Sequence, residues 1–146
     1  MSEKDILLVE DNPDDAELTR IAFEEAGGVH RLHLASDGAE ALDFIRGRGR
    51  HAGREPGDLP ALVLLDLNLP RLNGREVLQA IRADPATRSL PVVVLTTSAE
   101  PFDVEEVYAL GANSYIQKPV EFERFVDVAR QIGLYWLALN LPPGKA

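Results

Sequence analysis

Several short apolar runs of this sequence end in side chains that could hold a metal ion or act as a nucleophile. Glu10 and Asp11 follow the first run, Asp66 follows a later one, Thr96 ends another, and Lys118 follows the expected strand Asn113–Gln117. Carboxylates that converge repel one another and need a cation to stay ionised together, and Mg²⁺ prefers such hard oxygen ligands. A carboxylate can also attack phosphorus to form an acyl phosphate, for which Asp66 is the best placed. These residue types predict a magnesium site beside a carboxylate nucleophile.

Each of these residues also has an ordinary structural interpretation. An acid at a strand end, such as Asp66, often caps the next turn or helix, and Glu10-Asp11 ahead of Asn12-Pro13 could serve only that purpose. Thr96 alone is typical of a turn, and Lys118 alone is typical of a solvated surface. The structural interpretation requires a separate coincidence at every position. We therefore prefer the chemical one.

The elements that must position these side chains follow from the hydrophobic pattern. Strands are expected at Ile6–Val9, His30–Ala35, Ala61–Leu65, Pro91–Leu95 and Asn113–Gln117. Continuous apolar runs that alternate with helices indicate a parallel sheet covered on both faces. In such a sheet, ligands bind beyond the carboxyl ends of the strands, which is where the candidate side chains lie.

Five helices are expected between and after the strands. The first opens at Asn12-Pro13 and stops at Gly27-Gly28, with an apolar stripe formed by Leu18, Ile21, Ala22 and Phe23. The others are expected after Ser36-Asp37, from Asn73-Gly74 to before Pro85, over Phe102–Leu110, and over Glu121–Leu139.

Length and composition fit one domain of 146 residues, 45% hydrophobic and 27% charged. The sequence has no cysteine, which excludes disulfides and thiolate metal sites. A net charge of −9 argues against nonspecific nucleic-acid binding. No apolar run approaches the length of a membrane helix, and the charged start Met1–Asp5 differs from a secretion signal. We expect a cytoplasmic protein with neither a nucleic-acid nor a membrane partner.

Four motifs resemble, in their order and register, the receiver domain of bacterial response regulators. They are Val9-Glu10-Asp11-Asn12, Leu65–Pro70 with Gly74 after it, Leu95-Thr96-Thr97, and Tyr115–Pro119. The resemblance covers about residues 4–138, so residues 1–146 are expected to be one receiver domain with a short tail at 140–146 and no output domain. It implies a flavodoxin-like, doubly wound α/β fold with a five-stranded parallel sheet in the strand order 2-1-3-4-5.

Carried over position by position, the resemblance implies a response regulator of a two-component phosphorelay, phosphorylated on Asp66 by a sensor histidine kinase. Asp11, Asp66 and the backbone carbonyl of Asn68 would bind Mg²⁺, with Glu10 acting through water where many family members have Asp. Lys118 would contact the phosphoryl group. Such a protein catalyses its own phosphorylation and dephosphorylation and is not a metabolic enzyme.

The resemblance also implies that Thr96 and Tyr115 form a switch pair. Phosphorylation adds about −1.5 to −2 charge at the mouth of the sheet. Thr96 would move toward that charge, and Tyr115 would turn into the vacated space, reshaping the face formed by the fourth helix, fifth strand and fifth helix. An exposed, uncoupled Tyr115 is the alternative. In the family the peptide bond before Pro119 is often cis, which would aim Lys118 inward.

The last helix is apolar around more of its axis than one buried face can use. Its inner stripe is expected to consist of Phe122, Phe125, Val126, Ala129, Ile132 and Leu134. Further apolar residues continue around the axis, namely Tyr135, Trp136, Leu137, Leu139 and Leu141. We predict a homodimer through the fourth-helix and fifth-helix face; a tail folded over its own core is the alternative.

A Gly/Arg-rich stretch, Arg46–Pro60, shows no periodicity and is long for a loop. It could dock a kinase or be a solvated loop. This stretch and the Tyr-Trp-Leu ending resemble the stand-alone receivers that work with bacterial phytochrome histidine kinases, which implies a bacteriophytochrome as the partner.

Two other functions remain open at this point. Haloacid-dehalogenase-like phosphatases use a second acid two residues after the nucleophile, where this chain has Asn68, and the chain lacks a cap segment. A receiver-like scaffold that is never phosphorylated would have no need of Asp11, Asp66, Thr96 and Lys118. Turnover of generic phosphate esters would favour the phosphatase, and no phosphorylation by any donor would favour the scaffold.

Overall fold

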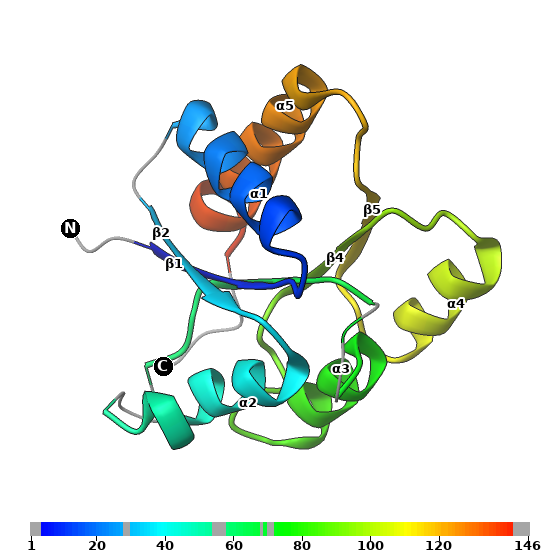
Figure 1. Ribbon diagram of the computed structural model, residues 1–146. Coiled ribbons are helices and arrows are strands. Elements are labelled where there is room, and N and C mark those ends of the chain that lie inside the picture. The colour runs from blue at the N-terminus through cyan, green and yellow to red at the C-terminus, as the bar shows by residue number, and fades with distance from the viewer. Residues whose placement is uncertain (1–3, 28–29, 54–57, 68, 70–71, 142–146) are drawn as a thin grey trace.

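A computed structural model describes residues 4–27, 30–53, 58–67, 69 and 72–141. Its centre is a five-stranded sheet in the order β2-β1-β3-β4-β5 with every neighbouring pair parallel (Figure 1). The strands are β1 (Lys4–Val9), β2 (His30–Ala35), β3 (Leu62–Leu65), β4 (Val92–Thr96) and β5 (Ser114–Gln117). The predicted strand order and direction are confirmed.

Five α-helices cover the sheet on both faces (Figure 1). They are α1 (Pro13–Ala26), α2 (Gly38–Arg46), α3 (Gly74–Ala83), α4 (Pro101–Ala109) and α5 (Phe122–Ile132). Helices α1 and α5 lie on one face, and α2 and α3 lie on the other. This two-sided cover explains why β3, β4 and the last four residues of β1 are almost entirely apolar.

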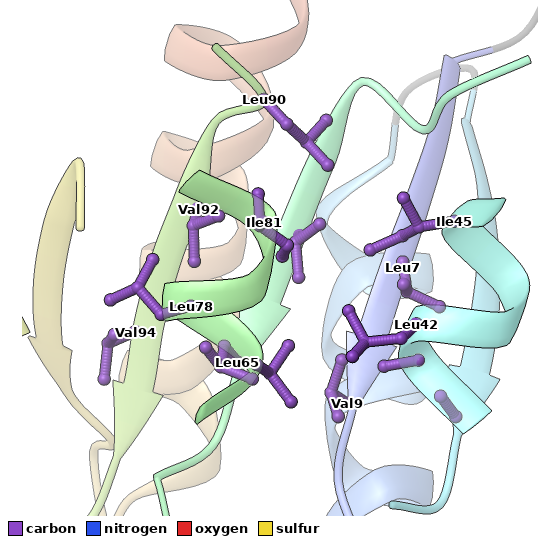
Figure 2. Close-up of a cluster of buried hydrophobic side chains, with 14 of the residues drawn as sticks. Leu7, Val9, Leu42, Ile45, Leu65, Leu78, Ile81, Leu90, Val92 and Val94 are labelled. Atoms are coloured by element: carbon purple, nitrogen blue, oxygen red, sulfur yellow. The ribbon is translucent and has the colours of Figure 1, made fainter. Parts of the chain in front are cut away.

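Alternate residues of the central strands point into two separate cores. Figure 2 shows the core between the sheet and helices α2 and α3, where Leu42 and Ile45 of α2 face Leu7 and Val9 of β1. The opposite core contains Ile6 and Leu8 together with side chains of α1 and α5. Because a strand turns successive side chains to opposite faces, the two cores together fix the register of the sheet.

Local capping explains where three helices begin. The side chain of Asn12 accepts hydrogen bonds from the backbone N–H groups of Asp14 and Asp15, at 2.9 and 3.1 Å, and Pro13 occupies the first helical position. Asp37 caps α2 in the same way, and Asn73 forms a capping box at α3. These starts agree with the sequence prediction, and α3 ends before Pro85 as predicted.

The prediction that Leu18 lies in the buried stripe of α1 is wrong. Its side chain is 45% exposed, and the buried face consists of Ala16, Thr19, Ala22 and Phe23. Thr19 fits this face because its hydroxyl donates a 2.8 Å hydrogen bond to the Asp15 carbonyl. The helix is therefore rotated so that Leu18 borders its inner face instead of filling it.

The end of the chain departs from the predicted single helix over Glu121–Leu139. Helix α5 ends at Ile132, and Gly133–Leu139 continues as a wider π-helical segment. Phe125, Ala129 and Ile132 are buried as predicted, whereas Phe122 and Leu134 are exposed. Trp136 and Leu137 pack against the core, whereas three other apolar side chains are exposed: Tyr135, Leu139 and Leu141. The tail thus covers its own core with some of its apolar residues only.

The Gly/Arg-rich stretch is partly anchored to α2. It contains a short 3₁₀ turn, η1 (Gly49–His51). The His51 ring packs edge-on against Phe44, and its Nε2 lies 3.3 Å from a carboxylate oxygen of Glu40. Residues 54–57 of this stretch lie outside the described residues. In the described part of the chain, no helix is long and apolar enough to cross a bilayer.

Candidate metal centre at the carboxyl edge of the sheet

Three acids from two neighbouring strands meet at the carboxyl edge of the sheet. One carboxylate oxygen from each of Glu10, Asp11 and Asp66 lies within 4.8 Å of the others. They converge because Val9 and Leu65 are paired in register, and the Asp66 N–H continues this pairing with a 3.1 Å hydrogen bond to the Val9 carbonyl. The structure therefore brings together the three acids that the sequence singled out.

The absence of a side chain at Gly74 permits the close approach of α3 to Asp66. A Cβ atom at this position would lie 2.4 Å from the Asp66 carbonyl oxygen and 2.8 Å from Leu67 Cα. The Gly74 N–H donates a 3.1 Å hydrogen bond to the Leu67 carbonyl. Any larger residue would push the start of α3 away from the segment that carries Asp66.

Burial differs sharply among the three acids. Glu10 is only 2% exposed, Asp66 is half-buried and Asp11 is exposed. Burial raises the pKa of the Glu10 carboxyl above its usual range, and the Asp66 charge adds to this effect. The hydrogen bond and charge of Lys118, and the backbone N–H of Asn12, act in the opposite direction. A divalent cation would favour the ionised form of the whole cluster.

The donor set fits a hard cation. All three acids offer oxygen, and the cluster opens to solvent at Asp11, which leaves room for water and a phosphate oxygen. Asn68, the other predicted ligand, lies outside the described residues. Glu10, Asp11 and Asp66 are therefore the side chains that would hold the metal.

Lys118 reaches this cluster from β5. Its Nζ donates a 2.5 Å hydrogen bond to Glu10 Oε1 and lies 4.0 Å from Asp15 Oδ2. The expectation of a cis peptide bond before Pro119 is wrong, because the bond is trans. Lys118 nevertheless points inward, and its backbone N–H donates to the Thr96 carbonyl at 2.7 Å. The ladder between β4 and β5 therefore aims this side chain without a cis bond.

Of the two predicted switch residues, Thr96 contacts the acidic cluster and Tyr115 contacts the loop between β4 and α4. The buried Thr96 hydroxyl donates to Asp66 Oδ1 at 3.3 Å. Tyr115 is half-buried against the core, and its hydroxyl donates a 2.8 Å hydrogen bond to the Ser98 carbonyl. Tyr115 is therefore not the exposed residue of the alternative interpretation, and its coupling to Asp66 stays a prediction. Its side chain packs against the core, which we call its inward orientation.

Comparison with known proteins identifies the family. The family model described as the response regulator receiver domain matches residues 6–130. The chain belongs to this family. The receiver is 44% identical over 144 residues to the probable methanogenesis regulatory protein FilR2 of Methanothrix harundinacea, covering 97% of this chain and 88% of that protein.

Two further relatives, Rcp1 and RcpA, are similar over nearly the whole chain. The receiver is 38% identical over 140 residues to response regulator Rcp1 of Synechocystis, covering 95% of this chain and 93% of that protein. A Mn²⁺-bound form of Rcp1 superposes with a TM-score of 0.85 at 36% identity, covering 97% of this chain and 99% of that one. The phosphorylated cyanobacterial phytochrome response regulator RcpA superposes with a TM-score of 0.88 at 37% identity, covering 98% of this chain and 100% of that one.

These findings decide the broad function. The receiver is a signalling protein of a two-component phosphorelay and not a metabolic enzyme, so the phosphatase alternative is set aside. Receiver domains bind a divalent metal, which agrees with the acidic cluster and with the Mn²⁺ in Rcp1.

Sequence reasoning missed one group of residues near the site. Arg75 of α3 donates hydrogen bonds to Asp103 and Glu106 of α4, and Asp103 also accepts one from the Ser98 hydroxyl. Asp103 and Glu106 are three residues apart, so the sequence already placed both acids on one side of the predicted helix. That placement could have indicated a shared basic partner. Their partner comes from another helix, so only the tertiary structure identifies it.

Proposed function

We propose that this receiver takes a phosphoryl group from a sensor histidine kinase onto Asp66, with Mg²⁺ bound beside it. The observation that carries the proposal is the convergence of Glu10, Asp11 and Asp66 within 4.8 Å at the edge that also holds Lys118 and Thr96. A carboxylate oxygen of Asp66 attacks phosphorus and forms the new O–P bond. The bond from phosphorus to the kinase histidine nitrogen breaks, and that nitrogen keeps the electron pair.

Each neighbouring side chain has a role in this transfer. Asp66 is half-buried, so its carboxylate is open to the incoming group. The Thr96 hydroxyl, already 3.3 Å from Asp66, would donate a hydrogen bond to a phosphoryl oxygen. Lys118 would leave Glu10 and place its ammonium on another phosphoryl oxygen. Tyr115, held by the Ser98 carbonyl, would then report the modified state on the surface of α4, β5 and α5.

We propose that the physiological metal is Mg²⁺, held by Asp11, Asp66 and the backbone carbonyl of Asn68, with Glu10 acting through water. The metal would neutralise phosphoryl oxygens and keep the group in line with Asp66. The all-oxygen donor set and the Mn²⁺-bound form of Rcp1 support this assignment. With the metal bound, the receiver would promote both its own phosphorylation and the later attack of water on the acyl phosphate.

We further propose that the kinase is of the phytochrome type and that it docks beside the site. The similarity to RcpA and Rcp1 supports the first point. For the second, a hollow of about 230 Å³ next to Lys118 lies between α1 and α5, and Leu18 and Phe122 expose apolar surface there. An exposed leucine at this place is suited to contact an apolar helix of a partner.

We also propose a homodimer through the face formed by α4, β5 and α5, continued by the C-terminal tail. Phe102 of α4 is 72% exposed, and Tyr135, Leu139 and Leu141 of the tail are exposed as well. Exposed apolar side chains of this kind are typical of a protein contact.

Labelling with acetyl phosphate tests the phosphorylation proposal without a kinase. The wild-type receiver should be labelled only when Mg²⁺ is present, and Asp66→Asn should remove the labelling. Asp127→Asn, which changes an exposed acid of α5, is the matched control and should label as the wild type does. Retained labelling of Asp66→Asn would refute the assignment, and no labelling of the wild type by any donor would favour a scaffold.

A further inference from the structure

Helix α4 has little hydrophobic anchorage to the rest of the molecule. All nine residues of α4 are described, and only Val107 among them is buried. Phe102 and Tyr108 of this helix are exposed. In Figure 1, α4 lies at the periphery of the molecule beside α3. Polar contacts must therefore contribute a large share of what holds this helix in position.

Arg75 supplies such contacts from the first turn of α3. Its Nη2 donates a 2.7 Å hydrogen bond to Asp103 Oδ1, and its Nε donates to Glu106 Oε1. The side chains of Arg75, Asp103 and Glu106 are 28%, 23% and 33% exposed. This shielding from water makes the pairs stronger than ion pairs on an open surface. One guanidinium thus joins two carboxylates one helical turn apart and prevents their mutual repulsion.

The same network continues to the switch tyrosine. Asp103 uses its second oxygen, Oδ2, to accept a 2.7 Å hydrogen bond from the Ser98 hydroxyl. The Ser98 carbonyl in turn accepts the 2.8 Å hydrogen bond from Tyr115. Asp103 is therefore fixed by Arg75 on one side and fixes the β4–α4 loop on the other. That loop carries the acceptor that holds Tyr115 inward.

We propose that Arg75 is a positioning residue of the switch, which stabilises the inward orientation of Tyr115 through Asp103 and Ser98. The inference rests on the proposed phosphorylation of Asp66 and adds a group outside the acidic cluster to it. The hydrogen bonds of Arg75 go to Asp103 and Glu106, and the proposal gives it no contact with the phosphoryl group or the metal. It acts by holding α4 and the β4–α4 loop where the Tyr115 hydroxyl can reach the Ser98 carbonyl.

Thermodynamic linkage gives this proposal a measurable consequence. A ligand shifts a two-state equilibrium only by its differential affinity for the two states, and the coupling is reciprocal. If Arg75 favours the inward orientation of Tyr115, then removing Arg75 must weaken the binding of any ligand at Asp66 that favours the same orientation. Beryllofluoride with Mg²⁺ serves as that group, because it mimics a phosphoryl group on a carboxylate and needs no kinase.

The experiment titrates beryllofluoride at saturating Mg²⁺ into protein labelled with fluorotyrosine and follows the Tyr115 signal by ¹⁹F NMR. The chain has three tyrosines, so Tyr→Phe variants assign the signals. Arg75→Ala should weaken beryllofluoride binding about fivefold and move the unliganded Tyr115 signal toward that of an exposed ring. Arg75→Lys keeps the charge but loses the two-pronged geometry and should fall between Arg75→Ala and the wild type.

Arg20→Ala is the matched control. Arg20 of α1 also donates to two acids, Glu17 and Glu24, but both acids belong to α1 itself, far along the chain from Tyr115. This variant should bind beryllofluoride as the wild type does. Ser98→Ala removes the hydroxyl link to Asp103, so adding it to Arg75→Ala should cause little further loss of affinity.

The outcomes separate this inference from the function on which it rests. No beryllofluoride binding by the wild type would contradict the phosphorylation proposal itself. Wild-type binding with an unchanged midpoint and Tyr115 signal in Arg75→Ala would overturn the positioning role. Urea unfolding of each variant is measured alongside. Lower stability of Arg75→Ala with unaltered beryllofluoride affinity would mean that Arg75 only supports the fold, and would also overturn the proposal.

Discussion

Lys118, directly after β5, donates a 2.5 Å hydrogen bond to Glu10, directly after β1. Strands β3 and β4 lie between β1 and β5 in the sheet, so this contact crosses most of the carboxyl edge. Both side chains are nearly buried, at 9% and 2% exposed. The ammonium therefore compensates one carboxylate of the acidic cluster. A phosphoryl group on Asp66 would compete with Glu10 for the same ammonium.

Removing one partner of this buried pair should lower the stability of the fold. Lys118→Met leaves Glu10 without its cation, and we expect a loss of about 3 kcal/mol in the free energy of unfolding, measured with urea in EDTA. The double variant Glu10→Gln, Lys118→Met should recover part of this loss, because it no longer buries an uncompensated charge. A loss below about 1 kcal/mol for Lys118→Met would show that the pair behaves like an exposed one.

Metal removal should lower stability, because the three carboxylates then repel one another. At a Mg²⁺ concentration about a hundred times its Kd, binding to the folded state adds about 2.7 kcal/mol. Thermal unfolding of the wild type should therefore shift upward with Mg²⁺ and return to its starting point in EDTA. Asp11→Asn should greatly reduce the shift, whereas Asp127→Asn should keep it. An equal shift in Asp11→Asn would argue against Asp11 as a ligand.

Some of this architecture could be predicted because its causes are local. The strands β1, β3 and β4 are short apolar runs, and Asn12, Asp37 and Asn73 carry the capping chemistry of the helices that follow. The edge at which the candidate residues meet follows from the parallel sheet alone.

Other features depend on how elements dock and could not be predicted locally. Leu18 and Phe122 are exposed because of the way α1 and α5 are rotated about their axes. The apolar pattern of a helix defines this rotation only to within part of a turn. The contact of Lys118 with Glu10 joins residues 108 positions apart. The sequence placed both residues at the carboxyl edge of the sheet but did not show that they pair with each other. The π-helical segment after Ile132 has no evident signal in the sequence.

The exposed Leu18 should contribute to phosphotransfer from the kinase and not to phosphorylation by acetyl phosphate. Leu18→Ser should reduce phosphotransfer from the cognate kinase about tenfold, because an apolar contact is lost, while labelling by acetyl phosphate stays unchanged. Leu34 on β2 has nearly the same exposure, 46% against 45%, and lies at the far edge of the sheet. Leu34→Ser is therefore the control and should keep full phosphotransfer. Equal loss in both variants would contradict docking at α1.

The proposed homodimer can be tested by sedimentation. The wild type should sediment as a dimer at high micromolar concentration, because Phe102 and the tail residues then lie in the interface. The double variant Phe102→Ser, Tyr135→Ser should sediment as a monomer, since both side chains are at least half exposed in one chain and would be lost from the interface. A wild type that is monomeric under these conditions would count against the dimer.

The central claim is that Asp66 becomes an acyl phosphate, and borohydride trapping tests this most directly. The receiver is incubated with acetyl phosphate and Mg²⁺, reduced with borohydride, digested, and sequenced by mass spectrometry. Borohydride converts an aspartyl phosphate to homoserine, so we predict homoserine at position 66 and unchanged aspartate at positions 11 and 15. Homoserine at another position, or none in a protein that carries the label, would contradict the account.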